Sequence, residues 1–257
     1  MNVVIPMAGS GKRFVDAGYD RPKPFIDVDH NTPMIQLVLL NLIPRQIGGN
    51  YHFILLCLSD FVSMYGVELD ARLKMIFESA RNDHIKLSYE IMEVNYNTEG
   101  AACTVLLAKD KINNDEELMI ANCDQLVLDR QVIDGSLEYY RERNVDGGIL
   151  CFLAESPKWS YCRMSGERIT EVVEKQVVSN LATVGIYYYR QGRMFVDAAE
   201  AMIGRQFKVN GEFYLAPAFN DMIVKDMKIV PYLVNDMVGL GTPEDLREHQ
   251  KRIWQKC

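Results

Sequence analysis

The sequence predicts an α/β protein in which helices cover both faces of one mainly parallel, mixed sheet. In the first half, short apolar runs of strand length alternate with segments whose apolar residues recur at three- and four-residue steps. Such alternation is typical of βαβ units and hence of parallel strands. In the second half, strand-like runs follow one another across turn residues such as Ser165-Gly166, which predicts a hairpin and makes the sheet mixed.

The elements expected in the first half are strands at 3–5, 52–57, 85–89 and 118–121, and helices at 33–47, 60–81 and 101–109. Those expected in the second half are strands at 147–152, 160–163, 168–173 and 182–189, and helices at 191–203, 219–225 and 243–254. No Ser/Gly linker, internal repeat or low-complexity segment interrupts them. The prediction is therefore a single domain over 1–257, whose residues 1–125 begin the sheet and whose residues 126–257 complete a pocket on it.

Composition excludes several classes of protein. The 257 residues include 48% hydrophobic and 25% charged side chains, which is ordinary for a globular protein and argues against disorder. The net charge of −7 argues against a broad nucleic-acid surface, because phosphate backbones require clustered cations. No apolar run approaches the roughly 18 to 20 residues of a membrane span, and no secretory leader is recognisable at the N-terminus. The six cysteines contain no Cys-x-x-Cys pair, which argues against a zinc site. Most of them stand in apolar strings, which favours reduced core residues of a cytoplasmic protein.

A glycine-rich loop directly follows the first expected strand. Gly9 and Gly11 would let the backbone approach a phosphate closely and aim its N–H groups at it. A P-loop is excluded, since it would require glycine at Pro6 and a hydroxyl residue at Arg13. A dinucleotide fingerprint is excluded because Phe14 stands where glycine or alanine is needed. Taken alone, the loop is equally compatible with a plain structural turn.

A second cluster strengthens the phosphate interpretation. Pro22 and Pro24 flank Lys23, so we expect an extended backbone there, outside any helix. A lysine held this way near Lys12 and Arg13 is what a triphosphate site needs. Without the glycine loop, a solvated surface lysine beside a proline turn would be the better interpretation.

Together these motifs resemble a known family. Ala8-Gly-x-Gly-x-Arg13-Phe14 followed by Pro22-Lys23-Pro24 is similar to the signature of the sugar-phosphate nucleotidyltransferases. These enzymes join a nucleoside triphosphate to a sugar 1-phosphate and release pyrophosphate; related members use phosphocholine or other small phosphates. The resemblance continues along nearly the whole chain. It implies a Rossmann-like three-layer αβα fold of the GT-A-like nucleotidyltransferase type, with a nucleotide-binding half over 1–125 and an acceptor-binding half over 126–257.

The resemblance implies roles for residues of the first half. Arg13 would hold the β- and γ-phosphates and Lys23 the α-phosphate region where the reaction occurs. The remaining nucleotide contacts would come from two loops, the second of which resembles a base-reading stretch and could equally be a loop-to-helix turn: Ala8, Gly9, Ser10 and Gly11, and Asn97, Gly100 and Ala101.

The resemblance also implies a magnesium site. Asp124 follows an apolar strand, and ligands of open α/β sheets gather beyond the carboxyl ends of strands. Mg²⁺ prefers oxygen ligands and retains several waters. The alternative is a purely structural role, in which the aspartate caps a turn. The family's second metal aspartate aligns with Gly239, so Asp236, three residues earlier, is the available substitute, and an ordinary strand-end aspartate is its alternative.

The acceptor would bind through the second half. Lys175 resembles the lysine of the family's Glu-Lys-Pro motif, although Gln176 replaces the proline, and a surface ion pair is the alternative. By the same resemblance Gly185 lies on the sugar-contacting strand, and Glu212, followed by Tyr214, occupies the place of a glutamate that binds sugar hydroxyls.

The implied reaction makes an NDP-sugar and pyrophosphate with Mg²⁺. Three other functions stay open: a cytidylyl- or uridylyltransferase of a non-sugar phosphate, a GT-A glycosyltransferase, and a nucleotide sensor without chemistry. The glycosyltransferase would need an Asp-x-Asp motif, whereas Gln125-Leu126 follow Asp124; the sensor is motivated by Gly239 and Gln176. The sequence does not decide the base, the acceptor or the oligomeric state, and a homo-oligomer stays open.

Overall fold

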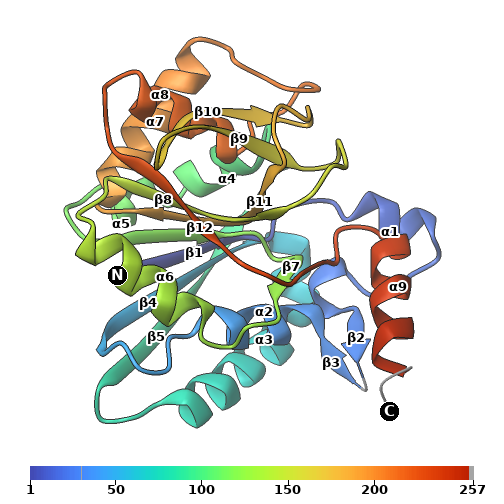
Figure 1. Ribbon diagram of the computed structural model, residues 1–257. Coiled ribbons are helices and arrows are strands. Elements are labelled where there is room, and N and C mark those ends of the chain that lie inside the picture. Colours follow the sequence, from blue (N-terminus) through green and yellow to red (C-terminus); the bar gives the residue numbers. More distant parts are fainter. Residues whose placement is uncertain (30, 255–257) are drawn as a thin grey trace.

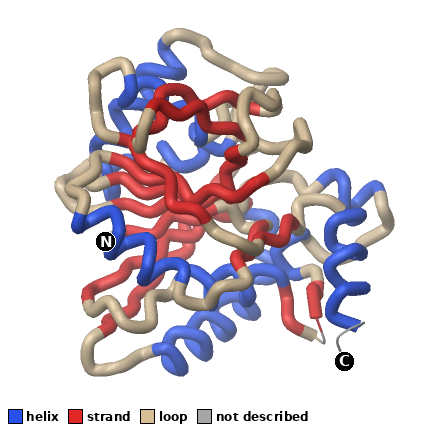
Figure 2. Tube along the Cα trace, viewed as in Figure 1, coloured by secondary structure: helices blue, strands red, loops and turns tan. Residues whose placement is uncertain are grey.

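The protein folds around one large sheet with helices on both faces. The computed structural model describes residues 1–29 and 31–254; His30 and Cys257 lie outside them. Within these residues nine strands form the sheet, in the order β10-β9-β11-β6-β1-β4-β5, with β8 beside β11 and β12 beside β8. Figures 1 and 2 show this sheet as a central layer between two groups of helices. The predicted α/β class is confirmed.

The first half of the chain supplies parallel strands. They are β1 (Asn2–Pro6), β4 (Gly49–Leu58), β5 (Ile85–Val94) and β6 (Leu118–Ala121). Strand β1 lies between β4 and β6, and β5 follows β4 at the edge, all in parallel. Each strand was expected from its apolar run. Their carboxyl ends therefore meet along one edge of the sheet.

The second half adds β11 (Leu181–Tyr189), which runs antiparallel to β6, together with four further strands. These are β8 (Gly147–Leu153), β9 (Ser160–Ser165), β10 (Arg168–Glu174) and β12 (Ile229–Leu233). Strands β9 and β10 form the expected antiparallel hairpin at Ser165-Gly166. The C-terminal end of β11 pairs with β6, whereas Ala182 near its start pairs with Tyr161 of β9, so β11 exchanges one neighbour for another.

Two apolar cores lie on opposite faces of the sheet. Val3 and Ile5 belong to one core and Val4 to the other, as the alternation of side chains along a strand requires. The first core is covered by α2 (Met34–Leu42), α3 (Ser59–Ala80) and α6 (Val132–Glu142). The second is covered by α4 (Ala101–Leu106), α5 (Lys109–Ile112), α7 (Gly192–Gly204) and α8 (Phe219–Ile223). This is the predicted three-layer arrangement, although α6 was not expected and 101–109 divides into α4 and the start of α5.

Short elements surround the carboxyl ends of the parallel strands. They are α1 (Lys12–Asp16), η1 (Lys23–Phe25), β2 (Asp27–Asp29), β3 (Thr32–Pro33), β7 (Gln125–Val127), η2 (Ala216–Ala218), β13 (Met237–Gly239) and α9 (Pro243–Trp254). The expectation that prolines keep Lys23 out of any helix is wrong. Lys23 begins a single 3₁₀ turn, in which Phe25 N–H donates to Pro22 O at 2.8 Å. Pro24 is compatible with this turn because the first residues of a helix have no intrahelical acceptor for their N–H groups.

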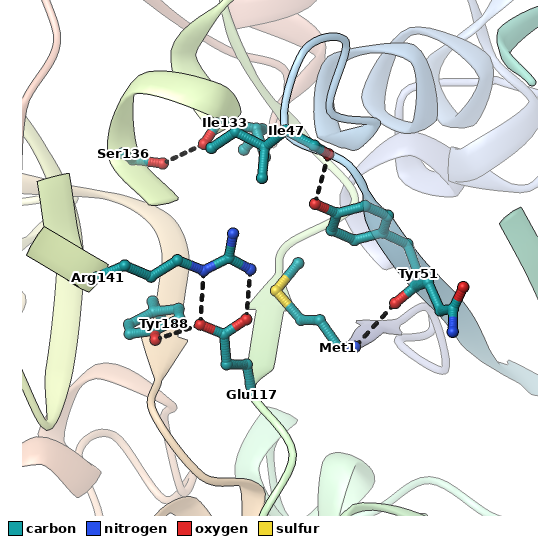
Figure 3. A network of polar contacts seen from close by, with 9 residues as sticks. Met1, Ile47, Tyr51, Glu117, Ile133, Ser136, Arg141 and Tyr188 are labelled. Atoms are coloured by element: carbon teal, nitrogen blue, oxygen red, sulfur yellow. Dashed lines mark hydrogen bonds and ion pairs between the residues drawn. The ribbon is translucent and has the colours of Figure 1, made fainter. Parts of the chain in front are cut away.

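A polar network ties α6 to the sheet beside the amino end of β6. The guanidinium of Arg141 donates to both carboxylate oxygens of Glu117, at 2.8 and 2.5 Å (Figure 3). The hydroxyl of Tyr188 donates to the same carboxylate at 2.8 Å. Because Glu117 directly precedes β6 and Tyr188 belongs to β11, this network holds α6, β6 and β11 together at the edge opposite the strand ends described next.

Of the helices in the described part of the chain, none combines the length and the apolar character needed to cross a membrane.

Candidate active site

Two adjoining cavities open at the carboxyl ends of β1 and β6. We call them the glycine-loop cavity, of about 630 Å³, and the β11 cavity, of about 560 Å³. The residues that line both are Arg13, Lys23, Ala101, Asn122, Asp124, Glu212, Tyr214 and Gly241. Ligands in the two cavities would therefore touch the same side chains where they meet.

The glycine loop forms one wall of the glycine-loop cavity. Met7 N–H donates to Leu56 O at 2.8 Å, which anchors the loop to the next strand. Gly11 has φ +60, a conformation that favours glycine, and its carbonyl accepts the N–H of Phe14 at 2.9 Å as α1 begins. Ala8, Gly9, Ser10 and Gly11 all line this cavity, with Gly9 and Ser10 exposed.

The opposite wall is the start of α4, which depends on Gly100. Its φ is +136, and a Cβ there would lie 2.4 Å from Phe213 O, so glycine is needed both for conformation and for space. The hydroxyl of Thr98 donates to Gly100 O at 3.0 Å and lies 2.6 Å from the hydroxyl of Thr104. Asn97, Gly100 and Ala101 line the cavity as the sequence suggested.

The same contact positions two acceptor-side residues. Phe213 N–H donates to Glu99 O at 2.8 Å, and Ala102 N–H donates to Phe213 O at 3.1 Å. Phe213 itself is buried, and its neighbours Glu212 and Tyr214 line both cavities. A backbone pairing between distant segments thus places these two side chains at the junction.

Lys23 and Asp124 meet at this junction. Lys23 Nζ donates to Asp124 Oδ2 at 2.5 Å, and both side chains are about one-fifth exposed, at 19% and 20%. Burial lowers the pKa of Lys23, but the charge and hydrogen bond of Asp124 together with the neighbouring Cys123 raise it by more, so this pKa lies above its ordinary value. The ammonium group is therefore charged at neutral pH.

Lys175 supplies a further cation in the β11 cavity. Its backbone is left-handed, with φ +55, and its N–H donates to Trp159 O at 3.0 Å. Its Nζ donates to the hydroxyl of Tyr214 and lies 4.4 Å from the centre of that ring. Burial and the nearby Glu212 raise the pKa of Tyr214, so the hydroxyl that accepts from Lys175 is a neutral phenol.

A buried carboxylate lies beside Lys175 in the β11 cavity. Glu174 is 9% exposed, and one carboxylate oxygen accepts a hydrogen bond from the Ser160 hydroxyl. Burial raises the pKa of Glu174 more than Ser160 and Lys175 lower it. Glu174 was not predicted as a site residue, because only the lysine of its Glu-Lys motif carries a role in the resemblance.

Strand β11 lines its cavity at Gly185, where the missing side chain leaves space. This residue has φ +89, and the pairing of β11 with β8 shifts between Thr183 and Tyr187. A Cβ at Gly185 would lie 1.9 Å from Gln125 Oε1 and 2.5 Å from Asn122 Nδ2, so two side-chain amides occupy that space. Asn122 and Gln125 were not predicted as site residues, although they flank Asp124 at the end of an expected strand.

The donor set around Asp124 is compatible with Mg²⁺ only if the substrate completes it. Within residues 1–29 and 31–254, no group of three or more His, Cys, Asp or Glu side chains could hold a metal ion. Mg²⁺ is commonly held by one or two carboxylates together with substrate phosphates and waters. Asp124 alone satisfies that smaller requirement.

Asp236 lies outside the lining of both cavities. It is exposed and precedes β13, where its carbonyl accepts Leu128 N–H at 3.0 Å. Gly239, which pairs with Gln125, is the β13 residue that reaches the β11 cavity. The substitution of Asp236 for the missing aspartate stays a prediction, which its place outside the lining of both cavities does not support.

All other predicted site residues line one or both cavities. Arg13, Lys23, Asp124 and Lys175 all line the β11 cavity, although they come from four separate segments. Gly185, Glu212 and Tyr214 line it too. The structure thus brings these residues together, while their individual roles stay predictions.

Comparison with known proteins agrees with this geometry. The model of a family described as "Nucleotidyl transferase" matches residues 2–255. The bifunctional protein GlmU of Thermodesulfovibrio yellowstonii is 25% identical over 195 residues, which is 70% of this chain and 40% of that protein. The chain thus spans well under half the length of this curated relative.

Solved structures share the fold over their whole length. A nucleoside-diphosphate-sugar pyrophosphorylase from Vibrio cholerae aligns with a TM-score of 0.77 at 21% identity, covering 97% of this chain and 99% of that one. A UDP-glucose pyrophosphorylase complexed with UDP-glucose aligns with a TM-score of 0.77 at 18% identity, covering 100% and 99%. At these identities the likeness shows a common fold.

Proposed function

Because the chain belongs to the nucleotidyl transferase family, we propose that it joins a nucleoside triphosphate to a sugar 1-phosphate, giving an NDP-sugar and pyrophosphate. The observation that carries the proposal is the convergence of Arg13, Lys23, Lys175 and Asp124 on one cavity. The family establishes a transferase enzyme, and the structural relatives include sugar-nucleotide pyrophosphorylases. The particular base, acceptor and metal belong to the proposal.

The obstacle in this reaction is repulsion between two polyanions. Two unit charges about 4 Å apart interact by roughly 4 kcal/mol at an effective dielectric constant of about 20. The acceptor phosphate is already an anion at neutral pH, so its oxygen needs no general base. Neutralising the repulsion and holding that oxygen in line with the bond that breaks supply most of the catalysis.

Each cation has a place in this scheme. Lys175 neutralises the acceptor phosphate in the β11 cavity, and Lys23, at the junction, neutralises the α-phosphate. The acceptor oxygen forms a bond to the α-phosphorus, and the bond from that phosphorus to the bridging oxygen breaks. Arg13, which lines both cavities, then stabilises the charge of the departing pyrophosphate.

Asp124 is the residue that would hold Mg²⁺, with phosphate oxygens and waters completing the coordination. When bound, the ion would neutralise charge on the phosphates as the bond to pyrophosphate breaks. Lys23 Nζ, now 2.5 Å from Asp124 Oδ2, lies where it can turn from the carboxylate to the α-phosphate.

Each half of the chain would bind one of the two substrates. The glycine-loop cavity is lined mainly by residues from the first 125, and the β11 cavity mainly by residues 158–245. We therefore assign the nucleotide to the former and the acceptor to the latter. Glu174 and Glu212 in the β11 cavity suit an acceptor with hydroxyl groups, which favours a sugar over a phosphate that lacks them.

The five described cysteines are free thiols, which supports a cytoplasmic protein.

A substrate matrix tests the proposal. The purified protein is incubated with Mg²⁺ and each common nucleoside triphosphate, against sugar 1-phosphates, phosphocholine and other small phosphates, and pyrophosphate is measured. Release with a sugar 1-phosphate is expected. Release only with phosphocholine or another non-sugar phosphate would replace the acceptor, and nucleotide binding without release in any combination would indicate a sensor. If an NDP-sugar is supplied instead, its consumption without formation or use of pyrophosphate would indicate a glycosyltransferase.

A further inference from the structure

The helix α3 carries a stripe of apolar side chains on its solvent-facing side. This α3 stripe consists of residues that recur at steps of three and four and so lie on one face of the helix: Met64, Val67, Ala71 and Met75. Met64, Val67 and Met75 are 70%, 88% and 60% exposed, and Ala71 is exposed too. Within residues 1–29 and 31–250, every other helix exposes at most one large apolar side chain. Figure 1 shows α3 at the lower edge of the molecule.

The α3 stripe takes no part in the core. The buried residues of α3 lie on the opposite side of the helix and belong to the core that α2 and α6 also cover: Phe61, Leu69, Leu73, Ile76 and Phe77. The helix is therefore apolar on two sides, one of which packs against the sheet while the other faces water. Apolar side chains that are exposed singly are ordinary, whereas a contiguous line of them marks an interaction site.

The charged residues along α3 are divided at Ala71. Residues 59–70 carry no basic residue and three acidic ones: Asp60, Glu68 and Asp70. Residues 72–81 carry one acidic residue, Glu78, and three basic ones: Arg72, Lys74 and Arg81. Two pairs within one chain, at 2.9 and 2.7 Å, leave their charges partly exposed: Glu68 with Arg72 and Asp70 with Lys74. A second α3 packed antiparallel would set each acidic half against a basic half, whereas a parallel one would set like charges together.

An antiparallel pair centred on Ala71 also matches the apolar residues. Val67 and Met75 each stand four residues from Ala71, so Val67 of one copy lies level with Met75 of the other. Ala71 of one copy meets Ala71 of the other, and so small a side chain at the crossing lets the two helix axes approach to about 8 Å. The face is therefore complementary to itself in shape and charge, as an interface with two-fold symmetry requires.

We propose that two copies of the chain associate through α3, as an antiparallel pair of helices related by a two-fold axis at Ala71. No residue of α3 lines the glycine-loop cavity or the β11 cavity, so the association leaves both cavities open. The 22 residues of α3 give a contact only about 33 Å long. Such a small interface predicts a reversible dimer with a dissociation constant of about 1 to 100 µM.

Sedimentation velocity of the full chain over a range of about 1 to 200 µM tests the proposal without any assay of activity. The wild-type protein should shift from monomer to dimer as its concentration rises. Val67→Glu should weaken the association by about tenfold or more, because a carboxylate would then be buried against Met75 of the other copy. Val224→Glu is the matched control: Val224 is 79% exposed just after α8, and its substitution should leave the association unchanged. A wild-type protein that stays monomeric, or a Val67→Glu variant that associates as the wild type does, would overturn the proposal.

Cross-linking tests the two-fold axis. With diamide as oxidant, Ala71→Cys should form a disulfide between two copies, because position 71 of each copy meets its counterpart at the axis. Met64→Cys, seven residues away, should not link beyond the wild-type level, although it would in a parallel pair. Equal linking of both variants would therefore overturn the antiparallel arrangement.

A lipid surface is the other possible occupant of the α3 stripe. Flotation with vesicles of phosphatidylcholine and phosphatidylglycerol measures it. Binding of the wild-type monomer that is lost in Val67→Glu would assign the stripe to a membrane and overturn the proposal. No binding to these vesicles, together with the concentration-dependent dimer, is the expected result.

Discussion

Lys23 and Asp124 form an ion pair of 2.5 Å across 101 residues of sequence, at the point where the two cavities meet. Lys23 comes from the short turn after the glycine loop and Asp124 from the end of β6. Since both side chains line both cavities, a ligand that bridges the cavities would contact this pair.

Lys23→Ala should lower turnover by about 10²- to 10³-fold, because it removes a cation from the α-phosphate in a site with little competing solvent. Pyrophosphate release at saturating substrates measures this, and circular dichroism checks the fold. Lys74→Ala is the matched control: it breaks a 2.7 Å pair with Asp70 on exposed α3 and should leave turnover unchanged. Wild-type turnover in Lys23→Ala would remove this lysine from the mechanism.

Asp124→Asn should abolish metal-dependent activity, since the amide keeps the shape of the carboxylate but lacks its charge for Mg²⁺. Activity is titrated with Mg²⁺ in both proteins, and wild-type protein is also assayed in excess EDTA. Full wild-type activity with the metal chelated would contradict the magnesium role. Retained binding of nucleotide by Asp124→Asn would show that the cavity itself survives.

Lys175→Ala should raise the KM for the acceptor by about tenfold while leaving the KM for the triphosphate within about twofold, as one charge-assisted contact is lost. The left-handed backbone at this position, with φ +55, could by itself penalise alanine. Lys175→Gly is therefore the control, because glycine accepts that conformation and also lacks the charge. Recovery of the acceptor KM in Lys175→Gly would assign the effect to the backbone and not to the ammonium group.

Gly100→Ala should reduce the free energy of unfolding by about 2 to 4 kcal/mol, since a Cβ placed at φ +136 strains the backbone and collides with Phe213. Urea unfolding measures the loss. Gly204→Ala, in α7 and free of any neighbour within 4 Å, should instead change stability by no more than about 1 kcal/mol in the favourable direction. Equal stabilities for the two variants would mean that the contact with Phe213 does not constrain position 100.

Glu117→Gln should destabilise the protein at pH 7 by about 1 to 3 kcal/mol and flatten its acid denaturation. Burial raises the pKa of Glu117, but the hydrogen bonds and charge of Arg141 lower it by more, so the folded pKa is depressed. A depressed carboxylate pKa contributes stability above the ordinary glutamate value of about 4.3, and that contribution is lost as the pH falls through the folded pKa. Urea unfolding between pH 7 and pH 3 should show a shallower decline for Glu117→Gln, and parallel curves would contradict this.

The parallel half of the fold was predictable because its signals are local. Each of β1, β4, β5 and β6 is a short apolar run, and their alternation with helical periodicity fixes a βαβ order. The helix α6 was missed although Ile133, Leu137 and Tyr140 recur at four- and three-residue steps and are buried, because Asp134 and Gly135 interrupt its apolar pattern. Asp134 is in fact buried, where its carboxylate accepts the backbone N–H groups of Arg45, Gln46 and Ile47.

The site residues that belong to sequence motifs were predictable, whereas contacts that depend on the packing of distant segments were not. The glycine loop, Lys23, Asp124 and Lys175 are marked by neighbours in sequence. Trp159 is different: its ring lies beside Gly239 only because the residue before β9 and the end of β13 come together in the fold, and no local pattern predicts that contact. The place of Asp236 outside both cavities has the same origin, since which residue of this segment lies beside Gln125 depends on the register of β13 against β7.

The continuity of the two cavities has a consequence for inhibitors. Because Arg13, Lys23, Glu212 and Tyr214 border both spaces, a single compound can lie across them without crossing a wall of main chain. A molecule that tethers a nucleoside polyphosphate to an acceptor-like group would lose translational entropy only once on binding, whereas two separate ligands lose it twice. Its affinity should exceed that of either fragment by orders of magnitude, provided that the tether matches the span between the glycine loop and β11.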